Sequence, residues 1–275
     1  SMYTEYQPSH LLVPYIDSYW EFKGNPDYGM RIHILPDGCT DFIFTLGEVA
    51  NAVEEGSLMM QPYRSYFVGP MTKYSELVTY TESIHMFGVR FLPCGLSCFT
   101  NLPLHEFVNS RVSTNEMKAV FDDTFIERLC EQKHIADRIR VVEEYLLAYL
   151  ARHYQPADSH VAMAVNMINH SKGKRSVRSL MDDVCLCQRH FERKFKHYTG
   201  FTPKEYSRIV KFKNAVELLR TTTSPNLLTT AVDAGYYDLA HFSKEIKSMS
   251  GNTPASFLSL TVPEETTLTY IEPQR

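Results

Sequence analysis

The feature that most limits how this chain folds is a phrase that occurs twice near its C-terminal end. The copies are FERKFKHYTGFTPKEY, residues 191–206, and FSKEIKSMSGNTPASF, residues 242–257. When they are aligned, the identical pairs are Phe191/Phe242, Lys196/Lys247, Gly200/Gly251, Thr202/Thr253 and Pro203/Pro254. Repetition of this kind predicts that one supersecondary unit is built twice.

Each copy predicts the second helix of a helix-turn-helix unit and the start of the helix that follows. Gly200 and Gly251 are placed to end the helix in a left-handed cap, and the Thr-Pro pair after each of them is suited to begin the next helix. In the second unit Asp238 stands at the expected N-cap, where its carboxylate accepts from free backbone N–H groups. Tyr206 and Phe257 are expected to pack in the core, so the shared residues build the scaffold.

The first unit departs from this pattern at three positions. Met181 takes the place of the small residue where two helices cross, Cys185 that of the turn glycine, and Cys187 that of the N-cap. A thiol caps a helix less well than a hydroxyl does, so we expect a frayed helix start and packing that opens around Met181.

Charge is distributed unevenly along the chain. The formal net charge is −4, which by itself disfavours nucleic acid, yet residues 1–157 carry −8 and residues 158–260 carry +6. A basic block behind an acidic one is typical of a regulator with a separate DNA-contacting half. Chance partition of charge between two unrelated domains is the alternative.

Short strands separated by turns are predicted for the N-terminal part, up to about residue 110. RIHILPDGCTDFIFTLG has two strand-like runs around Pro36-Asp37-Gly38, a turn signal, and SYFVGP and IHMFGVRFLP are further short runs. This pattern indicates a sandwich or a small barrel.

The hydrophobic spacing then becomes helical, most clearly in IADRIRVVEEYLLAYLARHY, residues 135–154. Its apolar face either packs on the β-rich part or forms a dimer surface. Gln155-Pro156 ends it, and Asp158 or Ser159 can cap the next helix. We therefore predict three regions, which are a β-rich sensor or dimerisation domain (1–155), a helical DNA-binding domain (156–262) and a tail (263–275).

The repeated phrase, the segment GYYDLAHFSKEIK and the helix that joins the two units resemble the AraC/XylS family of bacterial transcription regulators, over residues 158–260. HILPDGCTDFIFTLG, YFVGP and GVRFLPCGL are similar to the sensor domain of one branch of that family. The resemblance implies an α+β multidomain fold, with an N-terminal cupin-like β-barrel and a C-terminal all-α double helix-turn-helix domain. It also implies that effector binding or dimerisation through residues 1–155 changes how residues 158–260 meet DNA.

The side chains expected to contact DNA lie opposite the apolar face of each recognition helix. Phe191 and Phe195 face inward in the first helix, and Phe242 and Ile246 in the second. The expected contacts of the first helix are Arg189, Glu192, Arg193 and Lys196. Those of the second are Leu239, Ala240, Ser243, Lys244 and Lys247.

The two sets differ in chemistry. Arginines contact guanine, whereas Leu239 and Ala240 suit thymine methyl groups, so we hypothesise polar specificity in the first unit and weak A·T preference in the second. Arg208 and Lys211 on the joining helix are expected to contact phosphates. A run of charges that simply faces solvent is the alternative for all of these positions.

Candidate effector residues are harder to identify. His33, Cys39 and Asp41 alternate near the turn, and with Tyr66 and Phe91 they are the candidates for a pocket wall. Core packing explains the aromatic residues at least as well. Cys94 and Cys98 lack the spacing of a zinc site and suit buried small hydrophobes, so no metal and no cofactor are predicted.

We therefore predict a sequence-specific DNA-binding transcription regulator, not an enzyme, controlled by a small-molecule effector or by dimerisation. Expected partners are double-stranded DNA, an unidentified effector, RNA polymerase if it activates transcription, and a second copy of the chain. No membrane span or signal-peptide pattern occurs, so a cytoplasmic location is expected. The alternatives are a thiol-reactive or catalytic N-terminal domain located on DNA by the helical half, and an N-terminal domain that only dimerises.

Overall fold

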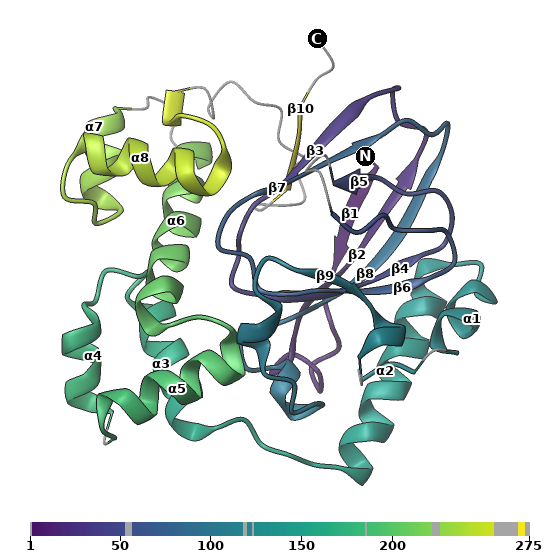
Figure 1. The fold of residues 1–275 in the computed structure, drawn as a ribbon, viewed down its shortest axis with the longest axis horizontal. Helices are drawn as coiled ribbons and strands as arrows, with labels where there is room; N and C mark the ends of the chain where they lie inside the picture. Colours follow the sequence, from purple (N-terminus) through teal and green to yellow (C-terminus); the bar gives the residue numbers. More distant parts are fainter. Residues whose placement is uncertain are drawn as a thin grey trace.

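A computed structural model describes residues 2–52, 57–117, 120–122, 124–184, 186–221, 226–255 and 269–272. The β-rich half and the helical half lie side by side, and helix α6 (Pro203–Thr221) runs through the helical half (Figure 1). The predicted change from strands to helices along the chain is confirmed, as is the α+β two-part fold. No helix of these segments is long and apolar enough to cross a bilayer.

Two antiparallel sheets form the β-rich half. The first sheet has the order β1 (Tyr3–Tyr6), β2 (Ile16–Gly24), β8 (Ile84–Phe91), β4 (Thr40–Thr45), β6 (Ser65–Val68) and β9 (Arg111–Ser113). The second sheet has the order β10 (Thr269–Glu272), β3 (Met30–Ile34), β7 (Ser75–Thr79) and β5 (Asn51–Ala52). Part of the predicted tail thus pairs with β3, in antiparallel register.

The first sheet carries apolar side chains on both of its faces. Along β8, Phe87, Val89 and Phe91 pack toward the helices, while Met86 belongs to the cluster between the two sheets. This alternation follows from the two-residue period of a strand. It places Arg90 on the same side as Met86, in the space between the sheets.

Gly88 on β8 allows the indole of Trp20 to lie flat on the sheet. A Cβ at Gly88 would come within 2.1 Å of the indole Nε1, so only glycine fits at this position. The same Nε1 donates to Oδ2 of Asp41 on β4, over 2.8 Å. Three neighbouring strands therefore hold Trp20 and Asp41 together between the sheets.

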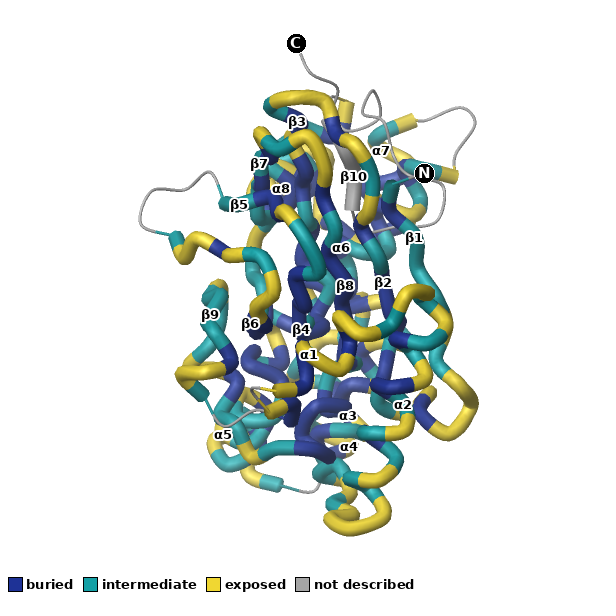
Figure 2. Tube along the Cα trace, turned by 90° about the vertical axis from the view of Figure 1, so that its right-hand side faces the viewer, coloured by how far each residue is buried: buried dark blue, intermediate teal, exposed yellow. Residues whose placement is uncertain are grey.

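Helix α2 (Ile135–Arg152) covers the outer face of the first sheet with α1 (Phe125–Cys130). Val142 and Leu146 are fully buried there, so packing on the β-rich half accounts for the apolar face predicted at residues 135–154. Figure 2 shows the central strands β2, β4 and β8 as mostly buried and many of the loops as exposed. Three short helices are η1 (Leu96–Cys98), η2 (Leu104–Phe107) and η3 (Thr114–Glu116).

The turn at Pro36-Asp37-Gly38 is confirmed, but it is a corner between sheets and not a hairpin. It leads from β3 in the second sheet to β4 in the first. Gly38 has φ +81°, which favours glycine, and Oδ1 of Asp37 accepts from the backbone N–H of Cys39 over 2.9 Å.

The helical half comprises α3 (Ser159–His170), α4 (Val177–Asp183), α5 (Gln188–Thr199), α6, α7 (Leu227–Asp233) and α8 (Leu239–Ser250). Asp158 caps α3, accepting from the backbone N–H groups of His160 and Val161, as one of the two predicted alternatives. Its carboxylate also pairs with Nζ of Lys194 at 2.6 Å. The end of α2 at Arg152 and the start of α3 at Ser159 bracket the predicted boundary.

Candidate DNA-binding surface and effector cavity

The first helix-turn-helix unit is α4 with α5. Phe191 and Phe195 of α5 are fully buried, so the opposite face of the helix is outward. Gly200 ends α5 with φ +86°. Cys187 is the N-cap and its thiol makes no capping hydrogen bond, as its chemistry predicts. Met181 is half-buried against the helical core, and the predicted turn position Cys185 lies outside the described residues.

Arg189, Arg193 and Lys196 are exposed on the outward face of α5. Glu192 is half-buried and accepts from Nε2 of Gln188 over 3.1 Å. Arg193 lies 3.1 Å from Nδ1 of His190. Three of the four predicted contacts are therefore cations open to a major groove, and the fourth is partly held by its own helix.

The second unit is α7 with α8. Asp238 caps α8, accepting from the backbone N–H of His241 over 2.7 Å, and Gly251 ends it with φ +79°. Phe242 and Ile246 are fully buried. The outward face carries Leu239, Ala240, Lys244 and Lys247, which are exposed, and Ser243, which is half-buried. The predicted core residue Phe257 lies outside the described residues.

Helix α6 joins the two units. Thr202 and Glu205 form a capping box at its start, since Oγ1 of Thr202 accepts from the N–H of Glu205 and Oε1 of Glu205 accepts from the N–H of Thr202. Tyr206 is buried and donates to Oδ1 of Asn169 over 2.7 Å, which ties α6 to α3.

The two cations predicted on α6 have partners inside the helical half. Arg208 donates from Nε and Nη2 to the two carboxylate oxygens of Glu245 on α8, each over 2.8 Å. Lys211 donates to the carbonyl of Gly235 and lies 5.5 Å from the ring centroid of Tyr236. Both residues fasten the second unit to α6, and about half of the Arg208 side chain remains exposed.

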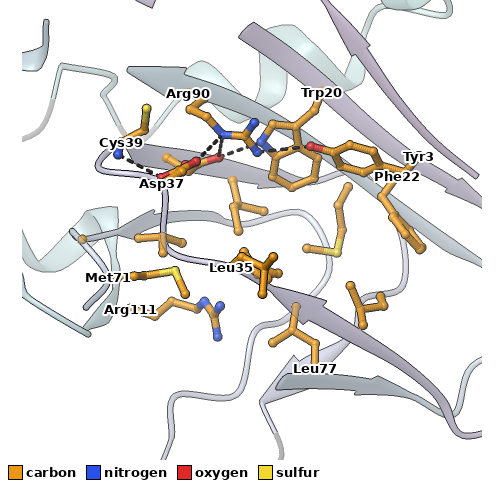
Figure 3. A pocket seen from close by; sticks show the side chains of 17 residues that line it. Tyr3, Trp20, Phe22, Leu35, Asp37, Cys39, Met71, Leu77, Arg90 and Arg111 are labelled. Atoms are coloured by element: carbon orange, nitrogen blue, oxygen red, sulfur yellow. Dashed lines mark hydrogen bonds and ion pairs between the residues drawn. The ribbon is translucent and has the colours of Figure 1, made fainter. Parts of the chain in front are cut away.

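A cavity lies between the two sheets, and its lining comes from both of them and from the corner that connects them (Figure 3). The apolar part of the wall includes Trp20, Phe22, Ile32, Leu35, Ile43, Met71, Leu77 and Met86. The polar part is Asp37, Cys39, Asp41, Arg90 and Arg111.

Arg90 is buried and surrounded by acceptors. Its guanidinium lies 3.4 Å from a carboxylate oxygen of both Asp37 and Asp41, and 3.2 Å from the hydroxyl of Tyr3. Burial alone would lower the pKa of Arg90, but Tyr3, Asp41 and Asp37 raise it well above its ordinary value. Burial raises the pKa of Asp41 to about 6, although Arg90 opposes that change. The charge of Arg90 is therefore balanced by acidic side chains of the protein itself.

The residues predicted for an effector pocket divide into two groups. Cys39 and Asp41 line the cavity. Phe91 lies on the helix-facing side of the first sheet, and His33 points away from the inter-sheet space, 3.7 Å from Oε2 of Glu76. Tyr66 lies between the sheets, but its hydroxyl accepts from the N–H of Gln61 and it is not part of the cavity wall.

Cys94 and Cys98 are buried, and burial raises the pKa of Cys94 to about 12 and also raises that of Cys98. Cys94 packs against the core of the helical half. Among the residues that the structure describes, no group of three His, Cys, Asp or Glu side chains is placed to hold a metal ion.

Comparison with known proteins agrees with this arrangement. A family model described as a helix-turn-helix domain matches residues 180–259. The chain is a DNA-binding transcription regulator with an AraC-type helix-turn-helix domain. A second model, described as a domain of unknown function (DUF6597), matches residues 4–113 of this AraC-type regulator. No curated protein matches the chain.

The chain is also similar to solved structures, two of which match it over most of its length. ToxT from Vibrio cholerae has a TM-score of 0.52 at 9% identity, over 88% of this chain and 98% of ToxT. ToxT bound to (E)-4-(8-methylnaphthalen-1-yl)but-3-enoic acid gives 0.51 at 10% identity, over 88% and 99%. The xylose-binding transcription activator xylR gives 0.34 at 24% identity, over 38% and 28%. The two ToxT matches show a shared two-domain fold.

Two features of the AraC-type regulator had no signal in the sequence. Tyr237, next to the cap of α8, is 91% exposed, and only its place beside Asp238 could have suggested a surface role. Arg111, on the edge strand β9, reaches the cavity. An arginine in a short polar segment gives no indication of where its side chain lies, so this residue could not be found from spacing.

Proposed function

We propose that the AraC-type regulator binds two adjacent major-groove sites through α5 and α8, and that a small molecule in the inter-sheet cavity controls this binding. The observation that carries the proposal is that both recognition helices end against the chain segment that contributes Gly69 and Met71 to the cavity wall. Two wall segments take part, the corner 35–39 and the segment 69–71 with its continuation to Tyr74.

The contact with the first unit is made at the end of α5 and the start of α6. A Cβ on Gly200 would lie 2.4 Å from Cγ of Pro70, and Pro70 stands between the wall residues Gly69 and Met71. Tyr206 packs on Gly38, and Leu35 belongs to the core of the helical half while it also lines the cavity. A change in the cavity wall therefore moves residues on which the end of the first recognition helix packs.

The contact with the second unit lies on the same connection between β6 and β7. A Cβ on Gly251, the C-cap of α8, would lie 2.7 Å from the Tyr74 ring. Since both recognition helices end against residues 70–74, this segment is placed to change the position of the two units together. A ligand shifts the equilibrium between two positions of this segment only if it binds more tightly to the protein in one of them.

The DNA contacts in this proposal come from the exposed faces of both helices. Arg189, Arg193 and Lys196 serve the first site, with Glu192 as the acceptor. Leu239, Ala240, Ser243, Lys244 and Lys247 serve the second. Arg208 and Lys211 contact phosphates in addition to holding the second unit. Helix α6 has 19 residues and is thus about 28 Å long, close to the ~34 Å of one DNA turn.

The effector part rests on the cavity and on the shared fold. A ToxT structure contains a substituted butenoic acid, and this chain has the same two-domain fold with a lined cavity of its own. Action on DNA places the protein in the cytoplasm. RNA polymerase is a partner if the regulator activates transcription, and a second copy of the chain is a partner if it acts as a dimer.

Selection of bound duplexes from a random DNA library tests the DNA-binding half of the proposal. The expected result is an enriched motif with two sites about one helical turn apart. Titrations on base-substituted versions should show a larger loss from transversions in the arginine-contacted site than in the other. Equal sensitivity of both sites would contradict the division of roles, and no enriched motif would contradict sequence-specific binding.

A further inference from the structure

Arg111 differs from the other arginine of the cavity in that its side chain has no ion-pair partner, although Asp41 acts on it from a distance. Within the described residues its side chain makes no hydrogen bond or ion pair. The residue is half-buried, and its Nε, like that of Arg90, is buried without a hydrogen-bond partner. Burial lowers the pKa of its guanidinium, which nevertheless stays charged, as an arginine does in a protein. Figure 3 shows the side chain directed into the cavity, below Leu35 and opposite Arg90.

An unpaired buried cation costs free energy that a protein normally avoids by pairing it. Arg90 illustrates the usual solution, since acidic side chains and the Tyr3 hydroxyl surround it. No acidic side chain of the described residues pairs with Arg111. A guanidinium group without an anionic partner in a mainly apolar cavity wall is suited to bind the anionic group of a ligand.

We propose that the cavity binds a small organic acid whose carboxylate pairs with Arg111 and whose apolar body lies against Leu35, Met71 and Leu77. The proposal rests on the effector role proposed above and names the chemical class of the effector. The cavity wall also carries Asp37 and Asp41, which repel a second carboxylate, so the ligand is a monoacid.

The size of the cavity limits the length of that acid. About 60 Å³ is open to the centres of water molecules, and one water needs about 10–15 Å³ measured in this way. The space therefore suits a few heavy atoms, as in a short-chain or single-ring carboxylic acid. A long alkyl chain does not fit.

Arg111 also lies at the route by which a ligand enters. A surface groove beside the cavity shares Val68, Met71 and Arg111 with it, so these three residues form the partition between them. Met71 has an unbranched, flexible side chain that can move aside. An acid approaching through the groove meets the guanidinium first.

Trp20 provides a direct readout, because it is the only tryptophan of the chain and it lines the cavity. Butanoate and benzoate are titrated into the full-length protein while Trp20 fluorescence is recorded, with butanamide and benzamide as uncharged counterparts and decanoate as the long acid. We expect at least one short acid to bind at least about 10-fold more tightly than its amide and than decanoate.

Arg111→Gln should weaken binding of that acid by at least about 10-fold. Arg64→Gln, which removes an exposed arginine just before β6, should leave it unchanged. Arg111→Met should raise the Tm of the ligand-free protein by about 2–4 °C, since it removes an unpaired buried charge. The proposal would be overturned if the amide bound as tightly as the acid, or if Arg111→Gln bound the acid as tightly as the native protein. A lowered Tm in Arg111→Met would also overturn it. So would the absence of binding by every acid up to 10 mM.

DNA affinity with and without the bound acid separates this proposal from the one on which it rests. An acid that binds through Arg111 and changes DNA affinity supports both. An acid that binds through Arg111 but leaves DNA affinity unchanged supports the anion site and overturns effector control.

Discussion

Tyr206 of α6 packs directly on Gly38, the corner glycine between the two sheets. A Cβ at Gly38 would lie 2.8 Å from Cε2 of Tyr206, closer than atoms of this kind approach. The next residue on either side of Gly38, Asp37 and Cys39, lines the cavity. The contact therefore joins the wall of the inter-sheet cavity to the helix that connects both helix-turn-helix units.

Replacing Gly38 with Ala should disturb this contact and change DNA affinity. The methyl group meets the Tyr206 ring, and the φ of +81° adds a backbone cost of about 1–2 kcal/mol. Gly29→Ala is the matched control, because Gly29 has φ +76° at the other end of β3. Urea unfolding should show a larger loss for Gly38→Ala by at least about 1 kcal/mol. Equal losses and unchanged DNA affinity would show that the contact carries no coupling.

Substitutions on the recognition helices should separate base contacts from phosphate contacts. Arg193→Ala should cost about 1–3 kcal/mol on the preferred site and relax base preference at one position. Lys247→Ala should weaken binding to all sequences alike and reduce the salt slope of log K by about 1. Fluorescence anisotropy at several salt concentrations measures both. If Arg193→Ala lowers affinity uniformly, α5 does not contact bases through this residue.

The carboxyl group of Asp41 should make stability depend on pH. Its pKa rises from 3.8 to about 6 on folding, mainly through burial, so the folded protein binds more protons than the unfolded chain between these values. The stability conferred by the protonated group is thus present below about pH 3.8 and lost as the pH rises through 6. The loss is on the order of 2–3 kcal/mol.

Asp41→Asn removes this dependence while it retains an acceptor for Trp20. As the pH rises from 4 to 7, the unfolding free energy of the native protein should therefore fall relative to that of Asp41→Asn. Asp17→Asn is the control, because Asp17 also faces Arg90, at 3.8 Å, but is more exposed. Parallel curves for the native protein and Asp41→Asn would contradict the raised pKa.

Alkylation should distinguish the buried cysteines from the exposed ones. Iodoacetamide reacts with thiolates, so Cys130 and Cys187, which are exposed, should react first. Cys94 and Cys98 are buried with raised pKa values and should react at least about 10-fold more slowly in the native protein. Peptide mass spectrometry after timed quenching measures each site. Rapid labelling of Cys94 or Cys98 would favour a thiol-reactive N-terminal domain instead.

Much of the helical half could be predicted from short stretches of sequence. Gly200, Gly251 and Asp238 act within one turn of their own helix, so their roles depend on nearby backbone groups. The inward position of Phe191 and Phe195 follows from a spacing of four residues on one helix. Arg208 is the exception, since its partner Glu245 comes from a helix far along the chain.

The cavity could be predicted only in part. The alternation of residues beside the turn predicts Asp41 in the cavity wall, where it lies. The prediction for Phe91 is wrong. Both faces of β8 are buried, so the sequence of this strand does not show which face meets the helices. The neighbouring Arg90 faces the cavity instead. Nothing in the sequence around Arg111 indicates that this residue lines the cavity.

By itself, the sequence determined the two helix-turn-helix units, their caps and the order of strands before helices, because those features depend on hydrogen bonds and periodicity within a few residues. The tertiary structure alone decided that the corner at Gly38 supports Tyr206 and that residues 70–74 meet the ends of both recognition helices. It also decided that Arg90 has acidic ion-pair partners, whereas Arg111 has none among the described residues. These are properties of which distant segments pack together, and a buried charge is paired or unpaired only once all of its neighbours are in place.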